Sequence, residues 1–332
     1  MEIRFGVRAA LVAAIAMFAS GLASAASMEL KFGHVGAPGS LFATSAEEFA
    51  KRANEKLGDK AKVVVFGSSQ LGGDKELLQK VKLGTVDFAL PSTVMSSVVP
   101  EFGLFELPYL VQDRDHMKKI SKEIVEPSLM PLAEEQGYKI IGVWENGFRQ
   151  ITNNKRPITV PEDLKGLKLR TPKGKWRVKM FQAYGANPSP MALSEVFVAL
   201  QTGVMDGQEN PLVQIYSQKF QEVQKYLSLS DHVYTPAYVV VSTKKWKRLP
   251  DDVRQVLEET ATEMTDFVYE TAAKLDNELV DKFKEAGVEV NEADKQAFVD
   301  ASESIYAEFA EEVSAAKEMI ATAQRIAPVA AR

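Results

Sequence analysis

Beyond residue 27, short apolar segments alternate with amphipathic ones. Residues 28–32, 62–66 and 86–90 are rich in apolar and β-branched side chains, and each segment is short enough to be a buried strand. Between them, apolar residues recur at helical spacing over 42–57 and 75–83, and a glycine follows each of these segments. This order predicts parallel strands joined by right-handed crossovers, with ligand-binding loops at the carboxyl ends of the strands. Those loops are residues 33–41, 67–74 and 91–95.

The middle of the chain repeats this alternation, which predicts a second α/β domain. The expected strands are 138–144, 148–153, 167–170 and 204–208, and the expected helices are 175–184 and 194–202. A late apolar strand, 238–242, follows a helical stretch. This strand indicates that the chain crosses back to the first sheet, so the two domains are expected to be discontinuous.

Residues 250–286 contain no glycine and no internal proline, and apolar residues recur at helical spacing throughout. A helix of this length would extend about 55 Å at 1.5 Å per residue, which exceeds the width of one domain. We therefore expect it to lie across both domains. A coiled-coil dimer is the alternative, but the apolar spacing does not keep a strict heptad and the stretch is strongly acidic.

The first residues have the pattern of an export signal. Arg4 and Arg8 precede an apolar run over 9–18, and the small residues of 21–25 form a signal peptidase site. We predict a signal peptide of residues 1–25, with cleavage after Ala25. An uncleaved membrane anchor is the alternative, but the apolar run is too short to cross about 30 Å of hydrocarbon. The prediction is an exported protein located in the periplasm.

The composition excludes several classes of chemistry. The chain has no cysteine, and its three histidines, His34, His116 and His232, are far apart, so no metal site with a usual ligand spacing is expected. The net charge of −5 becomes −6 once the signal peptide, with one acidic and two basic residues, is removed, which argues against nucleic-acid binding. No G-x-S-x-G motif or phosphate loop is present. We expect no metal, no cofactor and a ligand that is either a small molecule or a protein.

Two arginines stand in or at the end of apolar strands, where a guanidinium group needs an anionic partner. Arg149 follows Phe148, and Arg170 ends the strand 167–170. An internal ion pair with an aspartate or glutamate is one explanation for each arginine. Two arginines on neighbouring strands of one domain instead favour a carboxylate ligand, which the planar guanidinium holds by two parallel hydrogen bonds. Asn210, just before a proline, would add an amide to the same place.

Several ordered segments resemble the substrate-binding proteins of tripartite ATP-independent periplasmic (TRAP) transporters, of the dicarboxylate-binding type. The resemblance extends over nearly the whole mature chain. The segments that carry it are 31–34 (KFGH), 68–72 (SSQLG), 84–88 (GTVDF), 107–109 (LPY), 146–153 (NGFRQITN), 161–172 (PEDLKGLKLRTP), 185–203, 206–212 (DGQENPL) and 220–227 (FQEVQKYL).

The resemblance implies a periplasmic-binding-protein-like fold of two α/β domains joined by hinge strands, with a long helix across both. Domain I would comprise 27–146 and about 236–275, and domain II 147–235 and about 276–332. The family holds a ligand carboxylate with the arginine that matches Arg170, adds a contact from the arginine that matches Arg149, and uses the asparagine that matches Asn210. Glu209 of the same motif is included among the candidate ligand-binding residues.

Departures from the sialic-acid binders of the family concern the other domain. Those binders carry a glutamate, an arginine and a phenylalanine where this chain has Ser92, Met95 and Leu193, which argues against sialic acid as the ligand. The resemblance still places Ser92, Met95 and Leu193 in the wall of the ligand cavity, as candidate ligand-binding residues. The first two loops offer His34, Gln70 and Asp74, which could bind hydroxyl groups or a second carboxyl group. A packed histidine and a helix-capping aspartate are the alternatives for His34 and Asp74.

The sequence thus predicts a monomeric solute-binding protein that captures a small organic acid and delivers it to the small and large membrane permease subunits of a TRAP transporter. The ligand class stays open between a C4-dicarboxylate and a sugar acid such as an aldonate or uronate. A periplasmic sensor subunit and an exported enzyme acting on such acids are the alternatives.

Overall fold

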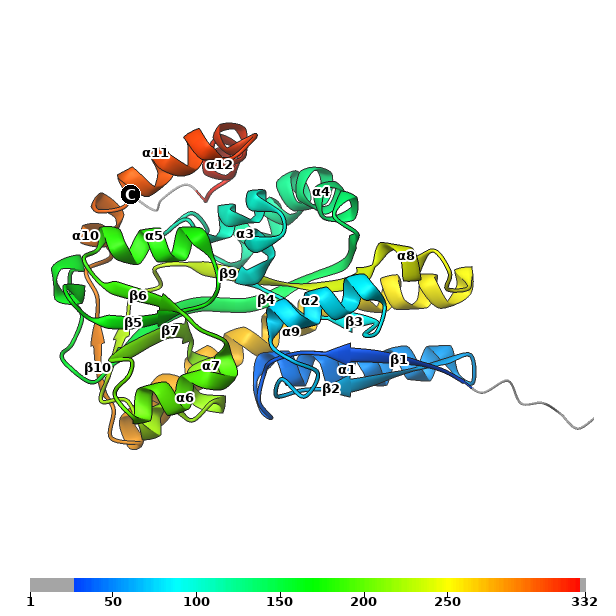
Figure 1. Ribbon diagram of the computed structural model, residues 1–332, viewed down its shortest axis with the longest axis horizontal. Coiled ribbons are helices and arrows are strands. Elements are labelled where there is room, and N and C mark those ends of the chain that lie inside the picture. The colour runs from blue at the N-terminus through cyan, green and yellow to red at the C-terminus, as the bar shows by residue number, and fades with distance from the viewer. Residues whose placement is uncertain (1–26, 329–332) are drawn as a thin grey trace, which may run out of the picture.

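The computed structural model describes residues 27–328. The predicted signal peptide lies outside the described residues. Figure 1 shows an elongated molecule in which two lobes, each a sheet covered by helices, lie side by side along the long axis. Within the described part of the chain, no helix is both long and apolar enough to cross a membrane.

The described residues form a ten-stranded sheet with the main-path order β2-β1-β3-β9-β4-β7-β5-β6, while β8 pairs with β4 and β10. The strands are β1 Met28–Gly33, β2 Ala61–Phe66, β3 Phe88–Ala89, β4 Tyr138–Asn153, β5 Lys168–Thr171, β6 Asn187–Pro190, β7 Gly207–Pro211, β8 Tyr226–Leu229, β9 Tyr234–Ser242 and β10 Glu289–Glu292. The first lobe contains β1, β2, β3, β9 and the first half of β4. The second lobe contains the rest.

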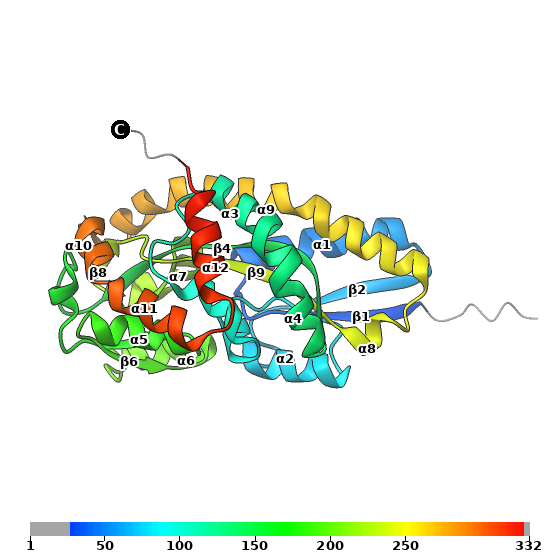
Figure 2. The same cartoon turned by 90° about the horizontal axis from the view of Figure 1, so that it is seen from above.

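Helices cover both lobes (Figures 1 and 2). The α-helices are α1 Leu41–Leu57, α2 Asp74–Leu83, α3 Arg114–Ile120, α4 Met130–Glu135, α5 Lys175–Ala183, α6 Leu193–Gln201, α7 Leu212–Ser217, α8 Thr243–Trp246, α9 Asp251–Glu285, α10 Lys295–Asp300, α11 Glu303–Glu312 and α12 Ala316–Arg325. The 3₁₀-helical segments are η1 Thr93–Ser97, η2 Pro100–Glu106, η4 Pro161–Leu164 and η5 Phe220–Glu222, and η3 Ser121–Leu129 is π-helical.

The first lobe has the parallel arrangement that the alternating pattern predicts. β1 pairs parallel with both β2 and β3, and β9 returns antiparallel beside β3. β3 is shorter than the predicted strand 86–90. Just before β3, the Asp87 carboxylate accepts a hydrogen bond from the Lys31 backbone N–H at 2.8 Å.

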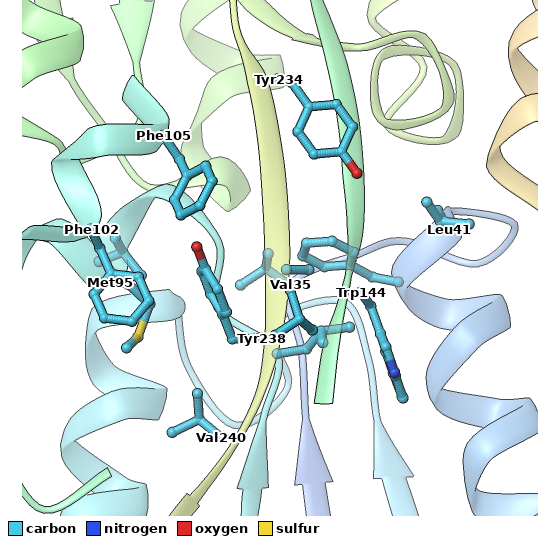
Figure 3. Packing of buried hydrophobic residues seen from close by; sticks show 14 of the residues in the cluster. Val35, Leu41, Met95, Phe102, Phe105, Trp144, Tyr234, Tyr238 and Val240 are labelled. Carbon is cyan, nitrogen blue, oxygen red and sulfur yellow. The ribbon is translucent and has the colours of Figure 1, made fainter. Parts of the chain in front are cut away.

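Aromatic side chains fill the core of the first lobe. Phe32 packs against Phe49 of α1 and Phe88 of β3 with ring centroids 5.8 and 5.7 Å apart. Figure 3 shows the neighbouring part of this core, in which Trp144 and Tyr238 come from β4 and β9. Such rings bury large apolar areas, so this core holds α1 and the strands as one rigid unit.

β4 is a single strand of 16 residues where the sequence predicts two strands. Its first part pairs antiparallel with β9, and its last part pairs with β7 and β8 of the second lobe. Glu145 and Asn146 interrupt the apolar pattern, which is why the sequence suggests a break. The register shifts at this point, between Glu145 and Gly147, and Glu145 is buried in an ion pair with Arg114 at 2.7 Å. β4 and β9 therefore join the lobes.

The predicted long helix is confirmed as α9, within one residue of the expected bounds at each end. It contacts α1 and β4 of the first lobe and α7 and β10 of the second, and Figure 2 shows it running along the molecule. Most of its apolar residues between Val253 and Phe283 are buried within this chain, and Val256, Phe267, Leu275 and Val280 are partly buried. Most of the apolar face of α9 is thus covered by the same chain, which favours a helix lying across both lobes over the coiled-coil alternative.

The last two helices connect the lobes a further time. On α11, the Phe309 ring packs on Trp176 of α5 in the second lobe, with centroids 5.1 Å apart. On α12, the Ala323 carbonyl oxygen lies 2.8 Å from Nε2 of His116 on α3. α12 therefore rests on the first lobe, although the sequence assigns all of 276–332 to domain II. The exact division into domains stays a prediction.

Candidate functional site

A cavity with about 190 Å³ of space for water-sized groups lies between the lobes. Each of the three loops predicted after β1, β2 and β3 contributes to its wall. The lining residues include Val35, Phe42, Gly73, Asp74, Ser92 and Thr93 from the first lobe, Asn146 and Arg149 from β4, and Arg170, Pro172, Lys173, Met191, Leu193, Asn210 and Gln214 from the second lobe. A ligand in this cavity would touch both lobes.

Arg170 is a buried cation in the wall of this cavity. It lies on β5 between β6 and β7 and is 3% exposed. Its Nε and Nη2 groups donate to the Met191 carbonyl oxygen at 3.0 and 2.6 Å, and it forms no ion pair with any of residues 27–328. Burial lowers the pKa of Arg170 to about 10, so the guanidinium stays charged at neutral pH. A buried cation without a direct counter-ion is suited to bind an anion.

Arg149 also lines the cavity, but it already has a carboxylate partner. Its Nε and Nη2 groups lie 2.5 and 3.0 Å from the two carboxylate oxygens of Glu209. Nη2 also donates to Oδ1 of Asn210 at 3.0 Å, and Nδ2 of Asn210 donates to Gln208. The ion-pair explanation considered from the sequence therefore holds for this arginine. Its visible role is to orient the Asn210 amide at the cavity wall.

Glu209 is fully buried and receives hydrogen bonds from three side chains. Besides Arg149, Nη1 of Arg177 donates to its Oε2 at 2.7 Å, and Nε2 of His232 lies 3.1 Å from the same oxygen. Burial alone would raise the pKa of Glu209, but Arg149 and Arg177 outweigh burial and lower it far below its usual range. Glu209 is therefore an ionised centre that fixes its neighbours, and it does not reach the cavity.

The protonation of His232 follows from its partners. Burial lowers its pKa, although Glu209 opposes this, so the ring is neutral at pH 7. The Glu209 carboxylate can only accept, so Nε2 carries the proton, and Nδ1 accepts from the Ser230 hydroxyl at 2.8 Å. This chain of hydrogen bonds ties the segment before β9 to β7.

The predicted residues fall into two groups. Arg170, Arg149, Asn210, Asp74, Ser92 and Leu193 line the cavity, whereas His34, Gln70, Met95 and Glu209 do not. Met95 is wholly buried in the hydrophobic core, of which Phe102 and Tyr238 are also members (Figure 3). Placing Met95 in the cavity wall was therefore incorrect, because the side chain of η1 at this position turns inward. Ligand contact itself stays a prediction for every residue.

His34 and Gln70 both lie outside the cavity, His34 because it is buried and Gln70 because it is on the exposed surface. His34 is buried with neither ring nitrogen hydrogen-bonded to any described residue, and burial lowers its pKa to about 4. It is thus a packed neutral histidine, the alternative considered from the sequence. Gln70 lies exposed on the loop after β2, outside the cavity.

Sequence reasoning missed four polar residues that shape the site. Asn146 and Gln214 line the cavity, and Arg177 and His232 hold Glu209. Arg177 could have been found, because it shares the apolar face of α5 with Met180, three residues further on. Gln214 gave no comparable signal.

The site can bind and orient an anion between two lobes. Arg170 offers charge and a planar set of donors, and the Asn210 amide lies beside it in the cavity wall. Residues 27–328 contain no cluster of metal-ligating side chains. Two α/β lobes, connecting strands and an anion-binding cavity between them define a solute-binding protein of the two-lobed class.

Comparison with known proteins gives the family. Residues 32–312 match the model of the bacterial extracellular solute-binding proteins, family 7, also called DctP. This match extends over most of the chain, and the chain belongs to this family, whose members include TRAP solute-binding proteins. The predicted resemblance is confirmed.

Some relatives bind an identified organic acid. The chain is 34% identical over 303 residues to the 2,3-diketo-L-gulonate-binding periplasmic protein of Escherichia coli, covering 91% of this chain and 92% of that protein. A TRAP solute-binding protein of Polaromonas with bound D-erythronate is similar at a TM-score of 0.87 and 34% identity. The match covers 92% of this chain and 100% of that chain. A TRAP solute-binding protein of Sulfurospirillum deleyianum with bound succinate is similar at a TM-score of 0.86 and 35% identity. The match covers 91% of this chain and 99% of that chain.

Proposed function

We propose that this protein captures a small organic acid in the periplasm and delivers it to the small and large membrane subunits of a TRAP transporter. The observation that carries the proposal is Arg170, a buried guanidinium that faces the cavity between the lobes without an ion-pair partner in the described residues. Membership of the family and the periplasmic location named for the relative from Escherichia coli support the transport role.

The proposed ligand is a C4-dicarboxylate or a sugar acid. Relatives with these ligands include a succinate-bound and a D-erythronate-bound structure. One water needs about 10–15 Å³ of such space, so the cavity of ≈ 190 Å³ holds about 13 to 19 water-sized groups. That capacity suits an acid of four to six carbons.

A thermal-shift screen of the mature protein tests the function. Succinate, D-erythronate, L-gulonate and a uronate are compared with the corresponding neutral amides, which lack the charge that Arg170 binds. At 100 times its Kd, a ligand should stabilise the protein by about 2.7 kcal/mol. We expect stabilisation by at least one acid and by none of the amides. Equal stabilisation by acid and amide, or none by any acid, would contradict the proposal.

Binding should also close the lobes. The cavity is bounded by both lobes, and β4 and β9 connect them, so a ligand that touches both walls favours the closed arrangement. Small-angle X-ray scattering should show a smaller radius of gyration at saturation with the acid found in the screen. The Arg170→Ala protein with the same concentration of acid is the control. An unchanged radius in the saturated parent protein would rule out a bridging ligand.

A further inference from the structure

Charged side chains from both lobes lie at the exposed rim of the cavity. Lys75 and Glu76 come from α2 of the first lobe, and Lys173 and Glu195 come from the second lobe. All four line the cavity and are exposed, unlike the buried Arg170. None of the four forms an ion pair with another of residues 27–328. The rim therefore carries two cations and two anions that are available to pair.

The N-termini of α2 and α6 meet across the cavity. Their N-caps are Gly73 and Ala192, and a Cβ atom placed on Gly73 would lie 3.8 Å from the Cβ atom of Ala192. In each helix a glutamate accepts a hydrogen bond from the N-cap backbone N–H, Glu76 at 3.1 Å and Glu195 at 3.2 Å. These bonds hold both carboxylates at the rim. Glu76 thus takes the helix-capping role considered from the sequence for Asp74.

Each lobe presents one cation and one anion at the rim. Lys75 and Glu76 are adjacent on α2, so their side chains do not face each other. Between the lobes, opposite charges can meet in two pairs, Lys75 with Glu195 and Lys173 with Glu76. The contact between the two N-caps places these charges where the lobes already touch. A lysine side chain is long and flexible, so a small movement of the lobes is enough for it to reach a carboxylate on the other side.

We propose that Lys75–Glu195 and Lys173–Glu76 are ion pairs that form between the lobes when the cavity closes on its ligand, and that they stabilise the closed form. This inference rests on the proposed function, in which ligand binding closes the lobes. The pairs do not touch the ligand. Because they favour the closed arrangement only, they raise the affinity for every acid that binds and select none.

Isothermal titration calorimetry with the acid found in the thermal-shift screen tests the pairs. The ionic strength is about 0.01 M, where the Debye length is about 30 Å. Lys173→Gln and Glu76→Gln should each weaken binding by about two- to fivefold, which is the usual range for an exposed ion pair. Glu76→Gln keeps the capping hydrogen bond, since a glutamine oxygen also accepts. The double variant should bind about as well as either single variant, because both changes break the same pair.

The second pair is tested in the same way, with Lys75→Gln, Glu195→Gln and their double variant. The glutamate variants separate the proposed pairs from direct attraction between the lysines and the anionic ligand. In the case of direct attraction, Glu76 and Glu195 would repel the ligand, so their replacement by glutamine would tighten binding. Tighter binding of both glutamate variants, or purely additive effects in both double variants, would overturn the inference.

Two controls show whether the effect depends on the rim. Lys165→Gln and Glu47→Gln remove exposed charges that do not line the cavity, and both should bind the acid like the parent protein. The rim variants should also keep the melting temperature of the unliganded parent, because the pairs are absent without ligand. At about 1 M salt the Debye length falls to about 3 Å, so the affinity differences should disappear. Differences that persist at high salt would show that these residues act by packing, and would overturn the inference.

The outcomes separate this inference from the proposed function. If an acid binds and small-angle scattering shows closure, but all four single variants bind like the parent protein, the proposed function stands and the inference is overturned. If no acid binds the parent protein, the proposed function fails and the inference fails with it.

Discussion

Replacing Arg170 with alanine should reduce the affinity for the organic acid by roughly 30-fold to several thousand-fold, corresponding to about 2 to 5 kcal/mol. The reason is that the ligand carboxylate would then be buried without its charged partner. Arg170→Lys should also weaken binding substantially, although the net charge is unchanged. A lysine keeps a point charge but loses the planar pair of donors that matches a carboxylate. Isothermal titration calorimetry of both variants measures the effect.

The control for these variants is Arg156→Lys. Arg156 also donates through Nε and Nη2 to backbone carbonyls, those of Asp163 and Lys165, but it is exposed and does not line the cavity. Arg156→Lys therefore measures how much ligand affinity and melting temperature change when only such hydrogen bonds to backbone carbonyls are lost. If Arg170→Lys binds the acid as tightly as the parent protein while it melts several degrees earlier, Arg170 only supports the fold.

Features that depend on neighbouring residues could be predicted from the sequence. The spacing of apolar residues gave α9 within one residue at each end, because a helix of 35 residues repeats its pattern many times. The position of Arg170 at the end of a short apolar strand was enough to predict a buried cation, since strand periodicity and burial are local properties. The break predicted inside β4 shows the limit. There, Glu145 is paired with Arg114, which lies 31 residues away in the chain.

Features that depend on distant contacts could not be predicted. Nothing near Arg149 in the sequence shows that Glu209, 60 residues away, will neutralise it. Likewise, Met95 occupies a position that the family resemblance places at the ligand, but the direction of its side chain is set by the packing of η1 against η2 and β9. The sequence thus indicates which residue types are available, while tertiary packing decides which of them face the cavity.

Glu209→Gln should destabilise the protein by about 3 to 5 kcal/mol at pH 7, which is the usual cost of removing one partner of a buried ion pair. Two buried guanidinium groups, those of Arg149 and Arg177, depend on this one carboxylate. Nε and Nη2 of Arg177 have no hydrogen-bond partner among the described residues, and Nη1 donates to Glu209, so Arg177 should be affected more strongly than Arg149 by this loss. Chemical denaturation of the unliganded variant measures the effect, and Glu222→Gln, which breaks only an exposed pair with Lys219, is the control.

The difference in stability between the parent protein and Glu209→Gln should depend on pH. The pKa of Glu209 in the folded protein lies far below its usual range, so its ionised form adds stability that is fully present above the unfolded pKa of about 4.3. As the pH falls below that value, the unfolded chain takes up a proton that the folded protein does not, and the parent loses about 1.4 kcal/mol of this advantage per pH unit. Glutamine does not titrate, so the stability difference should shrink between pH 4 and pH 3 and stay constant between pH 6 and pH 8. A difference that is constant over the whole range would mean that the pKa of Glu209 is the same in the folded and unfolded chains, and a difference that falls as the pH rises from 6 to 8 would mean that Glu209 is neutral in the folded protein. In that case Arg149 and Arg177 would be held by hydrogen bonds alone, and the ionised centre that orients Asn210 at the cavity wall would not exist.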